Sequence, residues 1–345
     1  MDPLTQGLLG AVAAQAALPA RHARAAWAGG LAGGLLPDAD VLLGPWSDPA
    51  LPWELHRHFT HGLLLAPVLG LLAAGLLLLL VPPLRAARRA VAAAAVLGAL
   101  THAPLDLCTS YGTKALWPFS RADLTWDLYP IIDPLFTLLL LLGVVLAAVR
   151  GRRRPAVLAL AGVALYSGAA LLQRSAALEA QATLARLRGH APVRARVLPL
   201  PCSLLAWRSL YEVQGEAVAD LLRITPWGGV QWVEGGRLPL LPAGQEAEGV
   251  ATPAGRARVL DVARRYRTFA DGWVARLPGE PLALGDLRFS LDPAFRPPWA
   301  LRLAASPDEP PVRWESRPLV EGDGWRLLAL LAGSDPALRP LPGTP

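Results

Sequence analysis

The sequence predicts an α-helical polytopic membrane domain followed by a small α+β or mostly β soluble domain. Three observations support this fold class. Long apolar runs fill the first half of the chain, arginine clusters separate these runs, and from about Gly189 the chain changes to short strand-like segments punctuated by Pro and Gly. Hydrophobic residues make up 53% of the 345 residues and charged residues 17%, so part of the chain is expected to lie in lipid.

Two apolar runs near the N-terminus are short. Leu4–Ala20 and Ala25–Leu36 each fall below the roughly 20 residues that a spanning helix needs. The second run is rich in glycine, and small residues allow helices to pack closely in a membrane. We therefore predict two short N-terminal helices that pack against neighbouring helices. The sequence leaves open whether they cross the bilayer.

Four longer apolar runs are predicted to span the membrane as helices. They are Gly62–Val81, Ala90–Leu107, Ile131–Val149 and Pro155–Leu172. Arginine clusters at residues 85–89 and 150–154 connect the first run to the second and the third to the fourth. By the positive-inside rule both clusters are expected in the cytoplasm. This orientation places residues 38–61, the loop at 108–130 and everything after Gln173 on the outer face.

The predicted domain boundaries follow from the changes in composition. Residues 1–173 form the membrane domain, residues 174–188 a connecting helix, and residues 189–333 the soluble domain. Short runs such as Ala206–Val213 are typical of strands. The Pro-rich tail at residues 334–345 is expected to be disordered.

The charge pattern argues against a nucleic acid partner. Lys114 is the single lysine, and the arginines are dispersed or lie at the ends of apolar runs, where they set topology. Cys108 and Cys202 are far apart and have neither metal-binding nor redox spacing. The expected partner of the first domain is therefore the lipid bilayer.

Ionisable residues are unusually frequent within the apolar first half. Four of the six histidines lie there beside aspartates, and the set comprises Asp38, Asp40, His56, His58, His61, His102 and Asp106. Ionisable groups are costly inside or against a bilayer, so their presence predicts a functional site. Histidine and aspartate together are ligands for a divalent metal, with zinc favoured and manganese or iron as alternatives.

Parts of this set have structural explanations. His102 and Asp106 are four residues apart and share a helix face, so they could form a hydrogen bond that joins two helices. Asp38 and Asp40 could belong to a turn. Asp133 precedes a proline, which is sufficiently explained by a helix N-cap followed by Pro at the first helical position. The three histidines of HRHFTH, just before a strongly apolar helix, have no comparable explanation.

Several motifs, taken in order, resemble one known family. They are PDAD at 37–40, HRHFTH at 56–61, HAPLD at 102–106, TSYGTKALWPFS at 109–120 and IIDPLFT at 131–137, with Thr5–Gly10 ahead of them. In order and spacing the chain resembles the YdjM-like family of LexA-regulated, inner-membrane-associated, metal-dependent hydrolases. The stretch LPLPCSLLAWRSLYEV at 198–213 is similar to the longer members, which have an added soluble domain.

The resemblance implies a set of site residues. The metal-site residues would be Asp38, Asp40, His56, His61, His102 and Asp106. Arg57 and Thr60 would support these residues. Beside the resemblance, Gln6, His58 and Asp133 are further candidates for contact with the metal's surroundings or the substrate. Arg57 and Asp106 are implied in catalysis. Gln6 stands where members usually have histidine, and Gly62 where they usually have serine. The change at Gln6 implies that the metal has one ligand fewer or that the contacts around its ligands are weaker.

The favoured function is that of a multi-pass inner-membrane hydrolase. A metal-activated water would attack an ester or phosphoester, and Arg57 would neutralise a phosphate oxyanion. The outer-face location and the aromatic residues Trp117, Phe119 and Trp126 favour a lipid or lipid-linked substrate. One alternative is a metal or proton transporter, for which ligands near the middle of the bilayer and repeated halves are expected. Another is a membrane scaffold with a structural metal, which four protein ligands without an open position would favour.

Overall fold

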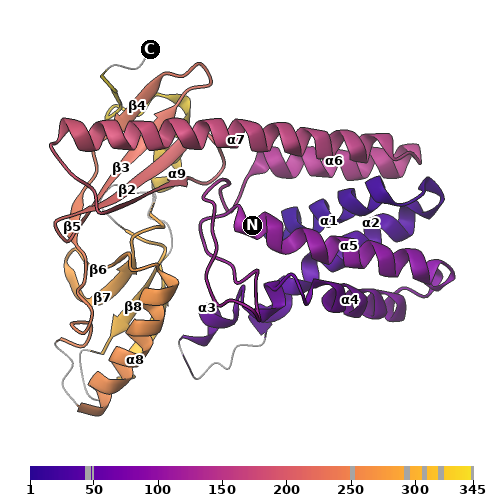
Figure 1. Cartoon of the computed structure of the whole chain (residues 1–345), viewed down its shortest axis with the longest axis horizontal. Coiled ribbons are helices and arrows are strands. Elements are labelled where there is room, and N and C mark those ends of the chain that lie inside the picture. Colours follow the sequence, from indigo (N-terminus) through magenta and orange to yellow (C-terminus); the bar gives the residue numbers. More distant parts are fainter. Residues whose placement is uncertain are drawn as a thin grey trace. The chain divides into compact units, whose positions relative to one another are not determined.

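The chain divides into two compact units. The computed structural model describes residues 1–42, 48, 50–248, 253–290, 296–304, 309–317 and 322–342. We call the unit that holds most of the chain up to Leu171 the helical unit, and the unit that holds most of the chain from Leu172 the sheet unit (Figure 1).

The helical unit consists of α-helices and short 3-10 turns. Its elements are α1 (Pro3–Ala17), η1 (Ala20–His22), α2 (Ala23–Leu35), η2 (Leu36–Leu42), α3 (Leu51–Leu55), η3 (Phe59–His61), α4 (Ala66–Leu80), η4 (Pro82–Ala87), α5 (Arg88–Leu107), α6 (Pro134–Arg150) and the first part of α7 (Arg154–Leu187). Asp2 caps α1 by accepting a hydrogen bond of 3.0 Å from the backbone N–H of Thr5. Asp133 caps α6 in the same way, with Phe136 as donor at 3.1 Å.

Glycines allow α1, α2 and α5 to pack with their backbones almost in contact. A Cβ atom added to Gly10 or to Gly98 would lie 2.3 Å or 2.2 Å from the carbonyl oxygen of Gly30. A Cβ atom on Gly33 would lie 1.9 Å from the carbonyl oxygen of Ala95. Real side chains cannot approach so closely, so these positions require glycine. The prediction that the short N-terminal helices pack against their neighbours is confirmed.

The long apolar helices are fewer than the four predicted spans. Within the described residues, Pro82–Leu107 and Arg154–Leu187 have the length and hydropathy of a membrane span. Trp53–His61 and Ala66–Leu80 pass only as a pair, bent by 93°, so the total is two or three. α6 is apolar but has only 17 residues. The predicted run from Gly62 therefore begins as a helix only at Ala66, after a sharp bend.

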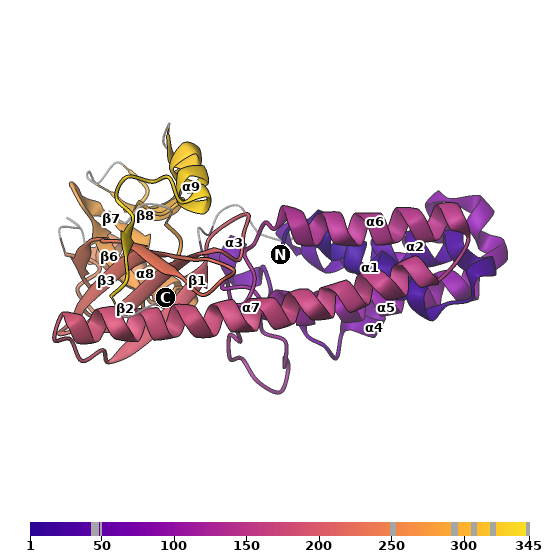
Figure 2. The same cartoon turned by 90° about the horizontal axis from the view of Figure 1, so that it is seen from above.

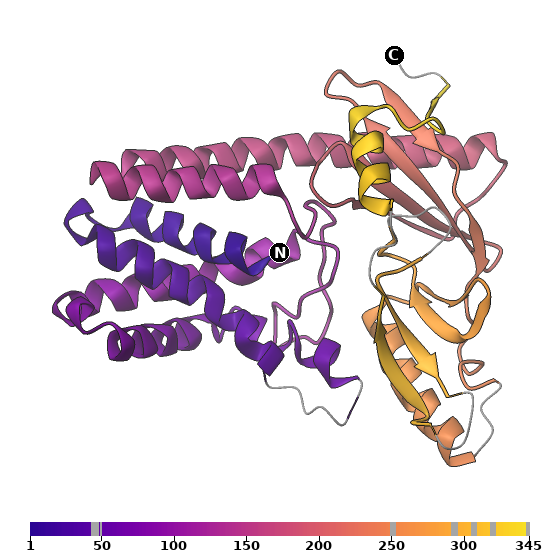
Figure 3. The same ribbon diagram turned by 180° about the vertical axis from the view of Figure 1, so that it is seen from behind.

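The arginine clusters gather at one end of the helical unit. The connections α1–α2, α4–α5 and α6–α7 all lie at that end (Figures 1 and 3). We call it the arginine end, and its arginines are Arg21, Arg24, Arg85, Arg88, Arg89, Arg150, Arg152, Arg153 and Arg154. The segments 36–42, 50–65 and 108–133 lie at the opposite end. The helical unit is therefore strongly polarised in charge.

The sheet unit contains two antiparallel sheets. One has the order β1 (Arg194–Pro199), β2 (Ala206–Val213), β3 (Glu216–Ile224), β4 (Val230–Val233) and β10 (Arg339–Pro340), with β5 (Arg237–Pro239) also paired to β3. The other has the order β6 (Val274–Leu277), β7 (Glu280–Asp286), β8 (Trp299–Leu303) and β9 (Val312–Ser316), and the unit adds α8 (Pro253–Phe269) and α9 (Asp323–Ala332). A C-terminal region built on short strands agrees with the predicted fold class.

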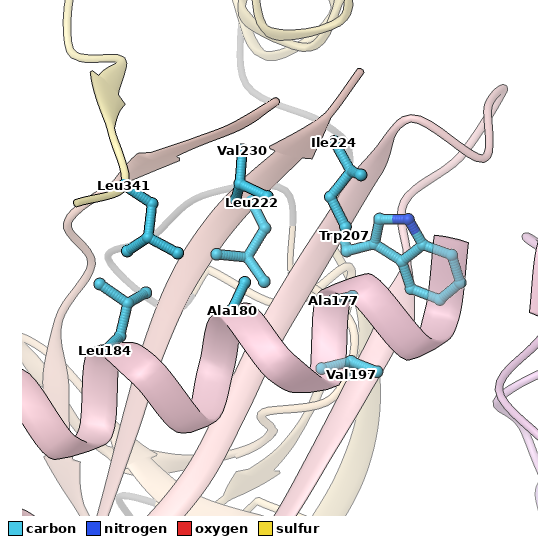
Figure 4. Packing of buried hydrophobic residues seen from close by; sticks show 9 residues of the cluster. All are labelled: Ala177, Ala180, Leu184, Val197, Trp207, Leu222, Ile224, Val230 and Leu341. Carbon is cyan, nitrogen blue, oxygen red and sulfur yellow. The ribbon is translucent and has the colours of Figure 1, made fainter. Parts of the chain in front are cut away.

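The second part of α7 belongs to the sheet unit. α7 is a single helix of 34 residues, so the predicted connecting helix is its direct continuation (Figure 2). Ala177, Ala180 and Leu184 of α7 pack against Trp207 of β2 and Leu222 of β3 (Figure 4). This small-to-large packing attaches the helix to the face of the first sheet.

The C-terminal tail contributes to the core of the sheet unit. In place of the disorder expected from residue 334, Arg339 and Pro340 pair antiparallel with Trp232 and Gln231 of β4. Leu341 is 2% exposed and joins the cluster between α7 and the first sheet. The physical reason is the edge of β4, whose backbone groups gain partners when the tail pairs with it. Residues 343–345 lie outside the described part of the chain.

Candidate metal centre

Four side chains converge at the end of the helical unit opposite the arginine end. They are Asp38 of η2, His61 of η3, and His102 and Asp106 of α5. One ligand atom from each lies within 4.8 Å of the others. The Nε2 atoms of His61 and His102 are 2.9 Å apart. His61 Nε2 lies 3.3 Å from Asp38 Oδ1 and 3.2 Å from Asp106 Oδ2.

The dimensions of this four-residue cluster fit a single metal ion. His102 Nε2 lies 3.4 Å from Asp38 Oδ1 and 3.5 Å from Asp106 Oδ2. Ligand atoms bound tetrahedrally to zinc at about 2.0–2.1 Å are about 3.3 Å from one another. Five of the six pairwise distances, 2.9–3.5 Å, are therefore close to those of a tetrahedral ligand set, although His102 and Asp106 come from one helix and Asp38 and His61 from two separate turns.

Local structure explains how each of the four side chains reaches the cluster. α5 continues through Pro104 to Leu107, so His102 and Asp106 lie on one face, one turn apart. Asp38 follows α2 without a break, because η2 begins at the residue after Leu35. The prediction that His102 and Asp106 share a helix face is confirmed.

The hydrogen bond at His102 Nδ1 determines which nitrogen of the ring carries the proton. This atom lies 2.7 Å from the backbone carbonyl oxygen of Gly34. A carbonyl oxygen only accepts, so Nδ1 must carry the proton. The neutral ring then presents the lone pair of Nε2 to the cluster, as a histidine ligand does.

His61 is oriented from behind by a carboxylate and a hydroxyl group. Its Nδ1 atom lies 3.3 Å from Asp40 Oδ2 and 3.0 Å from Thr60 Oγ1. Asp40 also accepts hydrogen bonds from the Thr60 hydroxyl at 2.6 Å and the Arg57 backbone N–H at 3.1 Å. Its other oxygen lies 2.9 Å from His56 Nδ1. A carboxylate behind a ligating histidine is a recurring arrangement in zinc sites.

Asp40 and His56 are therefore not in the four-residue cluster, although the sequence predicts both as ligands. Both oxygens of Asp40 already have donors, which leaves this carboxylate to orient His61. Burial acts to raise the pKa of Asp40, but the contacts with His56 and His61 outweigh it and hold the pKa below the usual range. Asp40 thus stays ionised, as its orienting role requires.

Asp106 has one oxygen that is fully hydrogen bonded and one that is not. Oδ1 accepts from Gln6 Nε2 at 2.8 Å and from the N-terminal amine of Met1, and it lies 3.3 Å from the Arg57 guanidinium. No described residue donates a hydrogen bond to Oδ2, which is buried and faces the two imidazoles. A buried carboxylate oxygen without a partner is costly. A cation at the centre of the cluster would remove that cost.

The two imidazoles also require a positive species between them. Nδ1 of His102 donates to a carbonyl oxygen and Nδ1 of His61 faces a carboxylate, so both Nε2 atoms would present lone pairs at 2.9 Å. Either a shared proton or a metal ion relieves this contact. Asp38 adds a negative charge, since the contacts with His102 and His61 outweigh burial and hold its pKa below the usual range. The donor set fits a divalent metal.

Arg57 positions Asp106 from a left-handed backbone conformation. Its φ angle is 63°, and its side chain is buried. The guanidinium donates to Thr109 Oγ1 at 2.8 Å and lies 4.7 Å from the ring centre of Tyr111. Sequence reasoning missed Thr109, Tyr111 and the carbonyl of Gly34. The TSYGTK motif could have indicated Thr109 and Tyr111. A backbone carbonyl that accepts a hydrogen bond cannot be recognised from the sequence.

The other predicted site residues lie around or away from the four-residue cluster. Gln6 forms a hydrogen bond with Asp106 of the cluster, and Thr60 forms one with His61. His58 is half-buried beside Phe59 and Trp117. Asp133 caps α6 and accepts a hydrogen bond from the Tyr166 hydroxyl, so the structural explanation accounts for it.

The comparison with protein families covers this part of the chain. The sequence model of the family described as YdjM inner membrane protein matches residues 1–177 of the 345. The chain belongs to this family. The match to the YdjM family includes all four residues of the cluster and ends within α7. Among curated proteins and among solved structures, no match to the chain was found.

Replacement of Asp40 by asparagine is expected to weaken metal binding by roughly 10–100-fold, because Asp40 contacts Nδ1 of His61 from outside the four-residue cluster. Chelator competition on the purified protein measures this change. Asp123→Asn is the matched control, since that carboxylate pairs with Lys114 on the surface. Loss of metal as complete as that caused by removal of His61 would identify Asp40 as a direct ligand.

Proposed function

We propose that this YdjM family member is an inner-membrane hydrolase that holds one divalent metal on Asp38, His61, His102 and Asp106. Zinc is favoured, with manganese or iron as alternatives. The observation that carries the proposal is the buried Oδ2 atom of Asp106, which lacks a donor among the described residues and faces two imidazole Nε2 atoms. The proposed substrates are esters or phosphoesters, with lipid-linked molecules among them.

The residues around the cluster support this chemistry. When bound, the metal supplies Lewis-acid polarisation of a substrate oxygen and acidification of a water molecule. Asp38 is the most accessible of the four residues, with its side chain 13% exposed, so water and substrate would approach from its side. Arg57 Nε has no described acceptor, so a phosphoryl oxygen could take that hydrogen bond.

A structural metal is the second candidate. Four protein ligands with almost complete burial are typical of closed sites. In that case the metal would hold η2, η3 and α5 together, and the helical unit would serve as a scaffold for the sheet unit. Transport is less well supported, because the cluster lies at one end of the helical unit and a transit site is expected near the middle of a membrane domain.

Metal analysis combined with a hydrolase screen distinguishes these candidates. The full-length protein in lipid nanodiscs would be assayed with soluble and lipid phosphoesters and carboxylic esters. A hydrolase should contain about one metal per chain, lose turnover on chelation and regain it when the metal is returned. Asp38→Asn should lower turnover, whereas His190→Ala, in the sheet unit, should not. A full complement of metal without turnover on any ester class would favour the structural candidate.

We also infer that the arginine end is cytoplasmic and that the sheet unit lies on the outer face. The inference rests on the arginines at that end and on α7, which begins there. In a Cys108→Ala, Cys202→Ser background, Val193→Cys should react with an impermeant maleimide on intact spheroplasts. Ala86→Cys, at the arginine end, should react only after permeabilisation. The reverse pattern would invert the topology.

A further inference from the structure

The loop between α5 and α6 is firmly attached to the helical unit. Thr113 and Leu124 exchange two backbone hydrogen bonds of 3.0 Å across it. The backbone N–H of Leu63 donates to the carbonyl oxygen of Ala115 at 2.9 Å, and that of Trp126 donates to Leu107 at 2.7 Å. The backbone of this loop, residues 108–133, is therefore fixed relative to α5 and to the segment that leads into α4.

Despite this attachment, the loop holds large apolar side chains away from the protein. Phe119 is 84% exposed, Trp126 56% and Leu116 48%. Trp117, between two of them, instead packs against Phe59. The exposed side chains are thus not the result of a loose loop. In water they would constitute an unfavourable apolar surface.

The same kind of surface continues onto the helices that begin at this end. Leu64, just before α4, and Val68, in its first turn, are exposed, as are Ile132, just before α6, and Leu135, in its first turn. Exposed leucines recur along both helices, and in an inner-membrane family such faces are suited to lipid. Arg121, in the same loop, is an exposed cation. Apolar rings beside a cation are typical of the layer where lipid headgroups meet acyl chains.

We propose that Phe119, Trp126 and Leu116 form a bilayer-contacting surface, with the interfacial layer of the membrane as its partner. The aromatic rings occupy the boundary between headgroups and acyl chains, and Arg121 pairs with lipid phosphates. The four-residue cluster, which is joined to this loop through α5 and the segment at 59–63, is thereby held close to the level of the headgroups. The proposal does not depend on hydrolysis.

Spin-label depth measurements test this surface directly. A nitroxide would be attached at Phe119→Cys in the Cys108→Ala, Cys202→Ser background, in nanodiscs that contain anionic lipid. Leu71→Cys, on an exposed face of α4, supplies the lipid reference, and Val193→Cys, in the sheet unit, supplies the aqueous reference. Collision rates with oxygen, which concentrates in lipid, and with a water-soluble nickel complex report the depth of each label.

The proposal expects the label at position 119 to collide more with oxygen than the label at 193 does, and less with nickel. Nickel accessibility equal to that at 193 would overturn it, because the loop would then lie in water. Low collision rates with both reagents would also overturn it, since a second copy or another part of the chain would cover the surface. Chelation of the metal should leave the depth unchanged, which separates this test from that of hydrolysis.

Discussion

Alanine at His61 or at His102 is expected to remove the bound metal from the folded protein and to abolish any activity that depends on it. Each ring offers an Nε2 atom to the four-residue cluster, and the two atoms are only 2.9 Å apart. Loss of either leaves three donors, and the effect should exceed the roughly 10–100-fold change that is expected when only an orienting residue is removed. Elemental analysis of purified variants measures the metal content.

The control must separate ligation from packing. His190→Ala removes a histidine that lies 2.8 Å from the Tyr211 hydroxyl and 2.9 Å from Arg237, all in the sheet unit. It should keep the metal. Circular dichroism of each variant establishes that the helices remain. Folded His61→Ala and His102→Ala proteins with a full complement of metal would disprove the ligand assignment.

Alanine at Gly33 is expected to destabilise the helical unit severely. The added Cβ atom would lie 1.9 Å from the carbonyl oxygen of Ala95, so α2 and α5 would have to move apart. Forced expansion of a packed core typically costs about 1–3 kcal/mol and sometimes more. Because η2 follows α2 directly, the movement would also displace Asp38 from His102, and metal affinity should fall together with stability.

Gly75→Ala provides the matched control for Gly33→Ala. No described atom lies within 4 Å of a Cβ atom added at Gly75 on α4, so the substitution meets open space. Alanine is about 1 kcal/mol better than glycine in a helix interior, so this variant should be as stable as the parent or slightly more so. Thermal unfolding in detergent or nanodiscs compares the two. Equal melting temperatures would show that the close packing of α2 on α5 is not needed.

The site residues could be predicted from the sequence only in part. His102 and Asp106 were accessible to reasoning because the helical period places residues four apart on one face. The different positions of Asp38 and Asp40, one in the four-residue cluster and one behind His61, could not be predicted in this way. Both aspartates precede the histidines in one short motif, and only the fold shows that Thr60, Arg57 and His56 supply Asp40 with donors. Hydrogen bonds that connect separate segments leave no periodic signal.

The fold, too, could be predicted from the sequence only in part. Apolar runs indicate which residues leave water, but hydropathy does not register the 93° bend between Trp53–His61 and α4. The prediction that the C-terminal tail is disordered was wrong for a similar reason. Its prolines argue for disorder when the tail is considered alone, whereas the edge of β4 and the apolar cluster that Leu341 joins exist only once the sheet has formed.

The short distance between the two imidazoles makes metal binding dependent on pH. If a proton holds His61 and His102 together when the metal is absent, each ion that binds must displace that proton into solution. Metal binding is then an exchange of a metal ion for a proton, so the apparent affinity falls as the pH drops. The four-residue cluster would therefore release its ion on acidification without any rearrangement of the helices, and would do so reversibly.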